Sequence, residues 1–286
     1  MTIDQLSNLI KDPNIFGYLI VRPFGLILLS LYNFVHNYGF AVILFALIVK
    51  LCCVPLAIKG KKSMLAMTAL NAEMQQLQKK YANNRAKLNE EIQALYERRG
   101  VSPMSGCLPQ FIPLPIMMGL YYAVQQPLQY IVGLSSETVI KLAQLVGLDN
   151  LAGANYTVQI VIAEKLNAFK DAVGNFTPDV FKCLADGESI FPMDFNFFGL
   201  NLADTPSIKH PGLIWIIPIL SGATAFLSSY VMQKMQSMPS SAAAGQMKML
   251  NLLMPLMSLY FGFILPGAIG IYWIFNNVFS CVQEII

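Results

Sequence analysis

The chain has 286 residues, of which 55% are hydrophobic and only 12% are charged, and its formal net charge is +3. Soluble domains carry about 25% charged residues, and here the apolar residues stand in long blocks, which argues against a soluble protein with a large core. The composition therefore indicates a membrane protein. Its five cysteines show neither metal-ligand nor redox spacing.

The first 37 residues contain one apolar block, 15–35, that is interrupted by Arg22 and Pro23 and also holds Asn33. Because Arg22 and Asn33 would be costly in lipid, we favour an outer-face segment, 1–37, with an amphipathic helix lying on the outer leaflet. The alternative is a sixth span. We expect no cleavable signal peptide, since a basic n-region and a small-residue cleavage site are missing.

Five further apolar blocks meet or approach the roughly 20 residues that a membrane-spanning helix needs. They predict spans at 38–58, 105–131, 211–234, 248–265 and 266–286. Residues 59–100 carry nine Lys and Arg against four acids, whereas 132–210 carries five lysines against nine acids. The positive-inside rule then places 59–104 in the cytoplasm, 132–210 and the N-terminus outside, and the C-terminus inside.

Segment 59–104 has the pattern of a helical hairpin. Apolar residues recur at spacings of three and four from Met67 to Tyr81, and again from Leu88 to Leu95, on either side of a polar turn. Such seams predict two antiparallel helices packed as a coiled coil. A plain spacer is one interpretation; the other is a hairpin that guides a substrate chain or touches anionic lipid.

Lys50 stands in the middle of the first predicted span, in FALIVKLCCVPL. A lysine at a helix centre costs about 2.5–3.5 kcal/mol on insertion scales. Its side chain could reach toward the cytoplasmic face. The sharper interpretation is that it faces a water-filled cavity between helices, as ionisable residues in membranes usually do.

Polar residues on the other spans support such a cavity, because they crowd the cytoplasmic half. They are Gln110 on the second span, Ser228 and Ser229 on the third, and Trp273 and Asn277 on the fifth. Serine in a span often bonds only its own backbone, so each residue alone is a weak signal. Together with Lys50 they predict a hydrophilic groove that is open to the cytoplasm and closed outside.

Methionines are concentrated near the cytoplasmic side, with seven of the fifteen between Met232 and Met257. Ordinary packing explains such residues. The alternative is a soft surface that accepts many apolar segments. On that interpretation the substrate-contact residues are Met64, Met67, Met232, Met235 and Met247.

Three segments resemble the YidC/Oxa family of membrane protein insertases. They are NYGFAVILFALIVKLCCVPLAIKGKK with the hairpin after it, ALYERRGVSPMSGCLPQFIPLPIMMGLYYAV, and LPGAIGIYWIFNN. The resemblance implies an all-α polytopic membrane protein with a five-helix core, a cytoplasmic antiparallel hairpin and no large periplasmic domain. The family typically has arginine where Lys50 stands, and lysine lacks the planar fork of arginine.

The resemblance also implies a function: insertion and folding of nascent membrane proteins in the bacterial inner membrane, without a turnover reaction or a cofactor. It implies the Sec translocon, ribosomes and membrane lipid as partners, and no nucleic-acid or metal site. Family members often dock ribosomes through a basic C-terminal tail, and none follows Ile286 in this sequence. Two alternatives are an assembly scaffold without insertion activity and, less well supported by the pattern, a small-solute channel.

Overall fold

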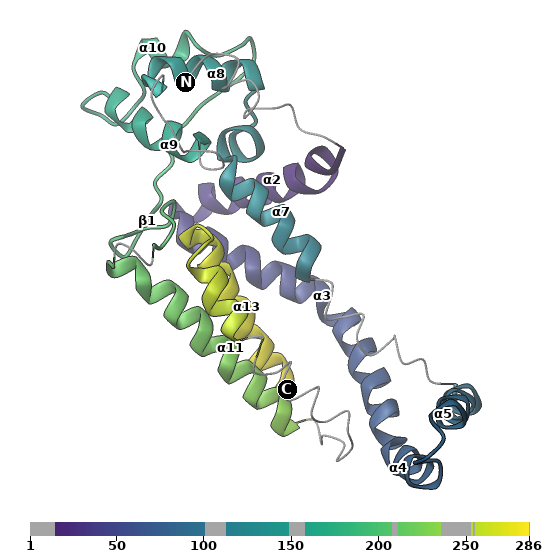
Figure 1. The fold of residues 1–286 in the computed structure, drawn as a ribbon. Coiled ribbons are helices and arrows are strands. Elements are labelled where there is room, and N and C mark those ends of the chain that lie inside the picture. The colour runs from purple at the N-terminus through teal and green to yellow at the C-terminus, as the bar shows by residue number, and fades with distance from the viewer. Residues whose placement is uncertain are drawn as a thin grey trace.

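The computed structural model describes residues 15–100, 113–148, 158–207, 211–235, 253 and 255–285. Helices dominate the described chain, and Figure 1 shows an elongated molecule with a long helical bundle between two smaller parts. The helices are α2 (Arg22–Val35), α3 (Tyr38–Ala69), α4 (Asn71–Lys80), α5 (Arg85–Arg99), α7 (Pro113–Gln125), α8 (Ser136–Leu145), α9 (Val158–Lys165), α10 (Pro178–Phe181), α11 (Ile216–Met235) and α13 (Gly267–Ile285). Short π or 3₁₀ segments are Gly17–Val21, Leu128–Val132, Leu166–Phe169 and Leu213–Trp215.

The bundle consists of α3, α7, α11 and α13 together with residues 255–262, which are also helical. α13 packs against both α11 and α3. Gly270 allows the close approach of α11, since a Cβ there would lie 2.3 Å from Cγ2 of Ile217. Pro55 lies inside α3 without ending it, as is tolerated in membrane helices.

α2 precedes α3 and is joined to it by only His36 and Asn37. Its buried face is narrow, consisting of Gly25 and Leu28 and continuing to Val21 in the preceding turn. Figure 1 shows α2 crossing α3 and α7 near one end of the bundle. That the helix lies on the outer leaflet stays a prediction, because by length and composition Gly17–Val35 could also cross a membrane.

The helical hairpin differs in detail from the expectation. α3 continues without a break past residue 58 to Ala69, so the first arm begins as an extension of the first span. The helix is interrupted at Leu70 before α4. Arg99 at the end of α5 binds Glu73 in the first turn of α4 at 2.5 Å, which requires the two arms to be antiparallel. Asn84 caps α5 by accepting from Lys87 N at 3.1 Å.

At the opposite end of the bundle lies a part that we call the capping module, residues 134–148 and 158–207. It contains α8, α9, α10 and a two-residue antiparallel hairpin, β1 (Asn196–Phe197) with β2 (Leu200–Asn201). α9 continues directly into the 3₁₀ segment Leu166–Phe169.

Glu188 ties parts of the capping module together. Its carboxylate accepts hydrogen bonds from Ser135 N at 2.6 Å, Thr138 Oγ1 at 2.5 Å and Ala185 N at 3.0 Å. Burial alone would raise the pKa of Glu188, but these hydrogen bonds together hold it below its ordinary value.

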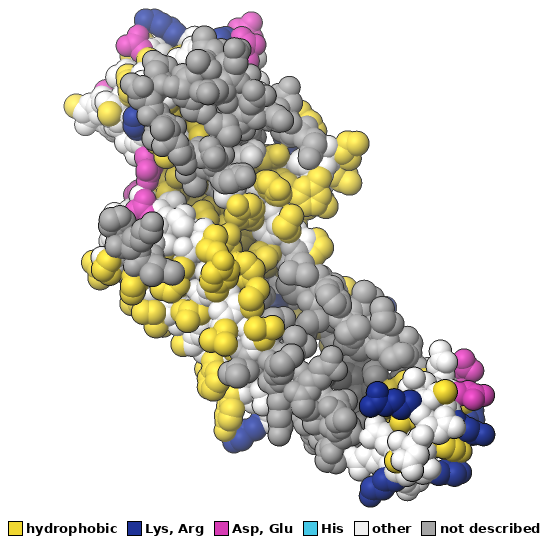
Figure 2. Space-filling view, viewed as in Figure 1, with side chains coloured by type: hydrophobic (Ala, Val, Ile, Leu, Met, Phe, Trp, Pro, Cys, Tyr) yellow, Lys and Arg dark blue, Asp and Glu magenta, His cyan; other side chains and the backbone are white. Residues whose placement is uncertain are grey.

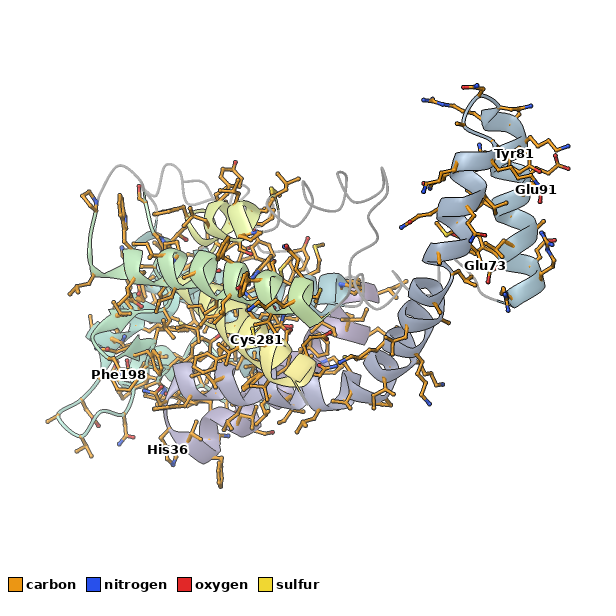
Figure 3. All side chains as sticks on the ribbon, turned by 90° about the horizontal axis from the view of Figure 1, so that it is seen from below. His36, Glu73, Tyr81, Glu91, Phe198 and Cys281 are labelled. Atoms are coloured by element: carbon orange, nitrogen blue, oxygen red, sulfur yellow. The ribbon has the colours of Figure 1, made fainter. Side chains whose placement is uncertain are left out.

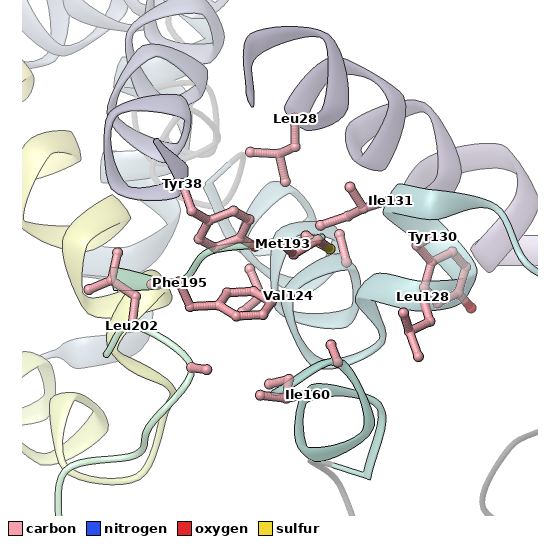
Figure 4. Packing of buried hydrophobic residues seen from close by; sticks show 14 of the residues in the cluster. Leu28, Tyr38, Val124, Leu128, Tyr130, Ile131, Ile160, Met193, Phe195 and Leu202 are labelled. Carbon is pink, nitrogen blue, oxygen red and sulfur yellow. The ribbon is translucent and has the colours of Figure 1, made fainter. Parts of the chain in front are cut away.

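The capping module and the bundle share one hydrophobic core. Figure 4 shows Tyr38 of α3 and Val124 of α7 beside Phe195 and Ile160 of the capping module. Gln129 and Gln159 are buried at this junction and hydrogen-bond each other through their side chains. The capping module is therefore packed directly on the bundle and is not joined to it by linkers alone.

The bundle exposes more hydrophobic side chains than the surface of a soluble monomer usually carries. They include Leu51, Leu56, Ile219, Phe226, Leu227 and Tyr230. Figure 2 shows hydrophobic side chains gathered over the bundle, with charged ones mainly toward its two ends. By length and composition Tyr38–Lys62 and Leu213–Lys234 could also cross a membrane. The all-α membrane fold is confirmed, and the count of five spans stays a prediction.

Candidate functional site

Lys50 is half-buried where α3 faces α13. Its Nζ donates a hydrogen bond of 2.7 Å to Oγ of Ser280, and that hydroxyl donates to the carbonyl of Asn276, also at 2.7 Å. Cys53 of α3 and Cys281 of α13 lie near the ammonium. Within the described ranges no carboxylate is ion-paired with Lys50.

A second polar contact lies nearer the capping module. Asn277 Nδ2 donates to Thr224 Oγ1 of α11 at 3.5 Å, a long bond, and Thr224 in turn donates to the carbonyls of Leu220 and Ser221. The hydroxyl of Ser221 is buried without a hydrogen-bond partner in the part of the chain that is described. Polar groups thus continue from the α3–α13 contact to the α11–α13 contact. We call Lys50, Ser280, Asn277 and Thr224 the polar layer.

The depths of these contacts agree with each other. At about 1.5 Å per residue, Lys50 lies about 18 Å along α3 from Tyr38, and Ser280 lies about 20 Å along α13 from Gly267. Asn277 lies about 15 Å along α13 by the same count. In a hydrocarbon core about 30 Å thick that begins near Tyr38, this polar layer lies near or just beyond the middle.

Trp273, Asn277 and Ser280 are spaced by four and three residues, so they share one face of α13. The Trp273 ring is half-buried and packs against Phe261, with the ring centroids 6.0 Å apart. Trp273 therefore forms the apolar part of this face, between the polar layer and the capping module.

Ser228 and Ser229 are half-buried on α11, as is Met232. Ser228 follows Thr224 by four residues and lies on the same face, whereas Ser229 is turned away by about 140°. The structure therefore connects Ser228 more closely than Ser229 with the polar layer.

The capped end of α13 is held by backbone groups. Gly267 N donates to the carbonyl of Asp204, and Ala268 N donates to the carbonyl of Leu202, each at 2.9 Å. These bonds use two of the amides that a helix start leaves without an intrahelical partner. The polar layer is thus separated from the capped end by packed chain, including the fully buried Ala268 and Ile269.

Several predicted site residues lie outside what the structure describes. Gln110 and Met247 fall outside the described residues, and of Met64, Met67 and Met235 only the backbone is described, in α3 and α11. The groove residues predicted from the sequence include neither Ser280 nor Thr224. Ser280 follows Trp273 by seven residues, a helical repeat that could have placed it on the same face.

The fold and this layer define a helical membrane protein in which a lysine ammonium is held by a serine hydroxyl between two helices. Residues 30–286 match the family described as 60Kd inner membrane protein, and the chain belongs to this family, the YidC/Oxa family of membrane protein insertases. The resemblance seen in the sequence is thereby confirmed, as is a bacterial membrane protein.

Similar proteins named membrane protein insertase YidC occur in several bacteria. The one from Chlorobium limicola is 28% identical over 99% of this chain and 39% of its own length. The one from Syntrophus aciditrophicus is 31% identical over 93% of this chain and 35% of its own length. The one from Alkalihalophilus pseudofirmus is 27% identical over 96% of this chain and 82% of its own length. The chain thus spans well under half of the first two relatives.

Proposed function

We propose that this protein inserts nascent membrane proteins into the bacterial membrane, and that the layer around Lys50 receives their hydrophilic flanks. The observation that carries the proposal is the Lys50 ammonium, which has a hydroxyl partner and, among the described residues, no carboxylate partner. A membrane-buried cation without a counter-ion attracts acidic groups strongly.

The proposed mechanism is physical rather than chemical, with no turnover reaction. An acidic flank of the substrate approaches Lys50 from the hairpin side, and its carboxylates replace Ser280 as partners of the ammonium. A substrate carboxylate that pairs with the Lys50 ammonium partway across the membrane costs less to desolvate than an unpaired one. The pairing therefore lowers the cost of translocating the flank. The apolar helix of the substrate then enters lipid, helped by the membrane potential at about 2.3 kcal/mol per charge per 100 mV.

The groove in this proposal is lined by Lys50, Gln110, Ser228, Ser229, Trp273 and Asn277. We add Ser280 and Thr224 to it because they hydrogen-bond with Lys50 and Asn277, respectively. Support for closure on the outer side comes from the packed capping module and the backbone bonds at Gly267 and Ala268. The proposed orientation puts the capping module outside and the hairpin in the cytoplasm, as the distribution of Lys and Arg favours.

The proposed partners follow from the same orientation. The hairpin α4–α5 and the Met-rich segment 232–257 would meet the emerging chain, with the Sec translocon and ribosomes as partners and lipid on the flanks. The hairpin lies at the far end of α3 from the capping module (Figure 1). Such a position lets it reach beyond the membrane surface toward a ribosome or a cytoplasmic chain.

The test is insertion of a small single-span substrate with an acidic outer segment into liposomes that hold the purified protein. Protease protection would compare wild type with Lys50→Arg, Lys50→Ala and Lys50→Glu. Lys59→Ala is the control, since Lys59 is an exposed lysine on the same helix. We expect wild type, Lys50→Arg and the control to insert, and the Ala and Glu variants to fail.

Equal insertion by all variants would refute the role of Lys50 as the receiving charge. Two results together would favour an assembly scaffold over an insertase. They are that the wild-type protein inserts nothing into liposomes, and that a membrane complex fails to assemble in cells depleted of the protein. A substrate with its outer acids changed to Asn and Gln should lose its dependence on Lys50, which separates charge attraction from a general effect on the fold.

A further inference from the structure

The turn between β1 and β2 places an aromatic residue where the backbone disfavours one. Phe198 and Gly199 form the two-residue turn and have φ angles of 51° and 79°. Turns of this kind favour Asn-Gly or Asp-Gly, and a bulky residue at positive φ is an outlier. The Phe198 side chain is also 81% exposed, so packing in the core does not explain its presence.

Phe198 belongs to a cluster that we call the aromatic tip: Phe40, Phe197 and Phe198. The Phe198 ring lies 4.7 Å from that of Phe197 and 6.0 Å from that of Phe40, between centroids. Phe197 packs directly over Gly39, where a Cβ would come within 2.1 Å of its ring. The tip is thereby seated on the first turn of α3.

The hairpin that carries the tip is fixed to the corner between α2 and α3. Asn37 Nδ2 donates to the carbonyl of Asn196 at 3.3 Å, and Asp194 N donates to the hydroxyl of Tyr32 at 3.2 Å. Within the turn, Gly199 N donates to Asn196 Oδ1 at 3.0 Å. The position of Phe198 is therefore set by the fold and not by a free loop.

The aromatic tip lies at the level where two candidate membrane spans begin. One span, Tyr38–Lys62, starts two residues before Phe40, and the other, Leu213–Lys234, starts at the 3₁₀ segment that β2 contacts. Leu213 is 81% exposed at this level as well. Figure 3 shows Phe198 at the same end of the molecule as His36, away from Glu73 of the hairpin α4–α5.

We propose that Phe198 inserts into the leaflet on the side of the capping module and anchors this module to the lipid. Apolar side chains, Phe among them, that face a membrane surface are buried about 5–10 Å into the boundary between headgroups and acyl chains, and the tip is continuous with the exposed hydrophobic surface of α3. This occupant accounts for both the exposed ring and the disfavoured turn: a functional need outweighs the local backbone preference. The anchor is independent of insertion activity.

The test uses tryptophan fluorescence in the full chain. Trp215 and Trp273 are the two native tryptophans, and both are changed to Phe so that Phe198→Trp gives a single emitter. The protein is placed in phosphatidylcholine vesicles brominated either near the headgroup or near the chain ends. We expect strong quenching by the shallow bromines and weaker quenching by the deep ones.

The matched control is Val173→Trp in the same background. Val173 is 84% exposed on another turn of the capping module. The hydrogen bonds of this turn are local and join Asp171 to residues 173 to 175. The emitter at 173 should stay unquenched. Equal quenching at both positions, or none at 198, would overturn the proposal.

Phe198→Asn distinguishes an anchor from a packing role. Asparagine tolerates positive φ, so the Tm of the Phe198→Asn variant in detergent should be unchanged or higher. The emission of the Phe198→Trp variant separately shows that the side chain at 198 lies in lipid. A lower Tm would assign Phe198 to the fold and overturn the anchor. Emission at 198 that ignores brominated lipid but changes with protein density would assign the tip to a second copy of the chain.

Discussion

Ser280→Ala tests whether Ser280 holds the Lys50 ammonium in the working position. The Lys50–Ser280 hydrogen bond is 2.7 Å long and joins a charged donor to a neutral acceptor. Bonds to charged groups contribute about 1.5–3 kcal/mol, and the lower end applies here because both side chains are half-exposed. Without the hydroxyl, the lysine side chain can extend toward the hairpin side. At about 1.4 kcal/mol per factor of ten, a loss of about 1.5 kcal/mol should slow insertion roughly tenfold.

The assay is the initial rate of insertion into liposomes, measured for Ser280→Ala, Ser280→Thr, Lys50→Ala and the double Ala variant. Thr keeps the hydroxyl and should restore most of the rate. Because Ser280 acts through Lys50, its removal should change little once Lys50 is already alanine. Additive losses in the double variant would refute this reasoning and assign Ser280 an independent role.

Gly25→Ala should lower the free energy of unfolding by about 1–3 kcal/mol, because its Cβ would lie 1.9 Å from the backbone carbonyl of Tyr130. Gly212→Ala, where a Cβ meets open space, is the control, and equal Tm values in detergent would contradict the prediction. Glu188 has a folded pKa below its ordinary 4.5, so its stabilising contribution is full above that pH and is lost as the pH falls through the folded pKa. Hydrogen exchange at Thr138 should therefore rise below pH 4.5 in wild type, and a Glu188→Gln variant that keeps this pH response would rule out the assignment.

Lys50 could be found from the sequence because a charge within an apolar block stands out whatever the fold. Asn277 and Trp273 were found for the same reason, through an unusual residue in a span. Whether these residues work as a groove stays a prediction. Ser280 was missed because serine is ordinary in membrane helices, and its importance comes from a partner 230 residues away in the chain.

The boundaries of the hairpin show a different limit. The seam from Met67 to Tyr81 reads as one continuous helix, yet the helix is interrupted at Leu70, which is buried. Periodicity records which face is apolar but not where the axis bends. The position of the capping module could not be predicted from the sequence either. It depends on contacts such as that of Gln129 with Gln159, which no local sequence pattern indicates.

The backbone bonds from Gly267 and Ala268 to the capping module make the start of α13 a pivot. At the other end the contacts are weaker, since Lys61 reaches Glu284 from an exposed side chain. A tilt of about 10° about this pivot would move Ser280, some 20 Å away, by about 3.5 Å. A displacement of that size directed away from α3 would break the hydrogen bond to Lys50, so the packing of α13 against α3 and α11 decides whether the ammonium stays held.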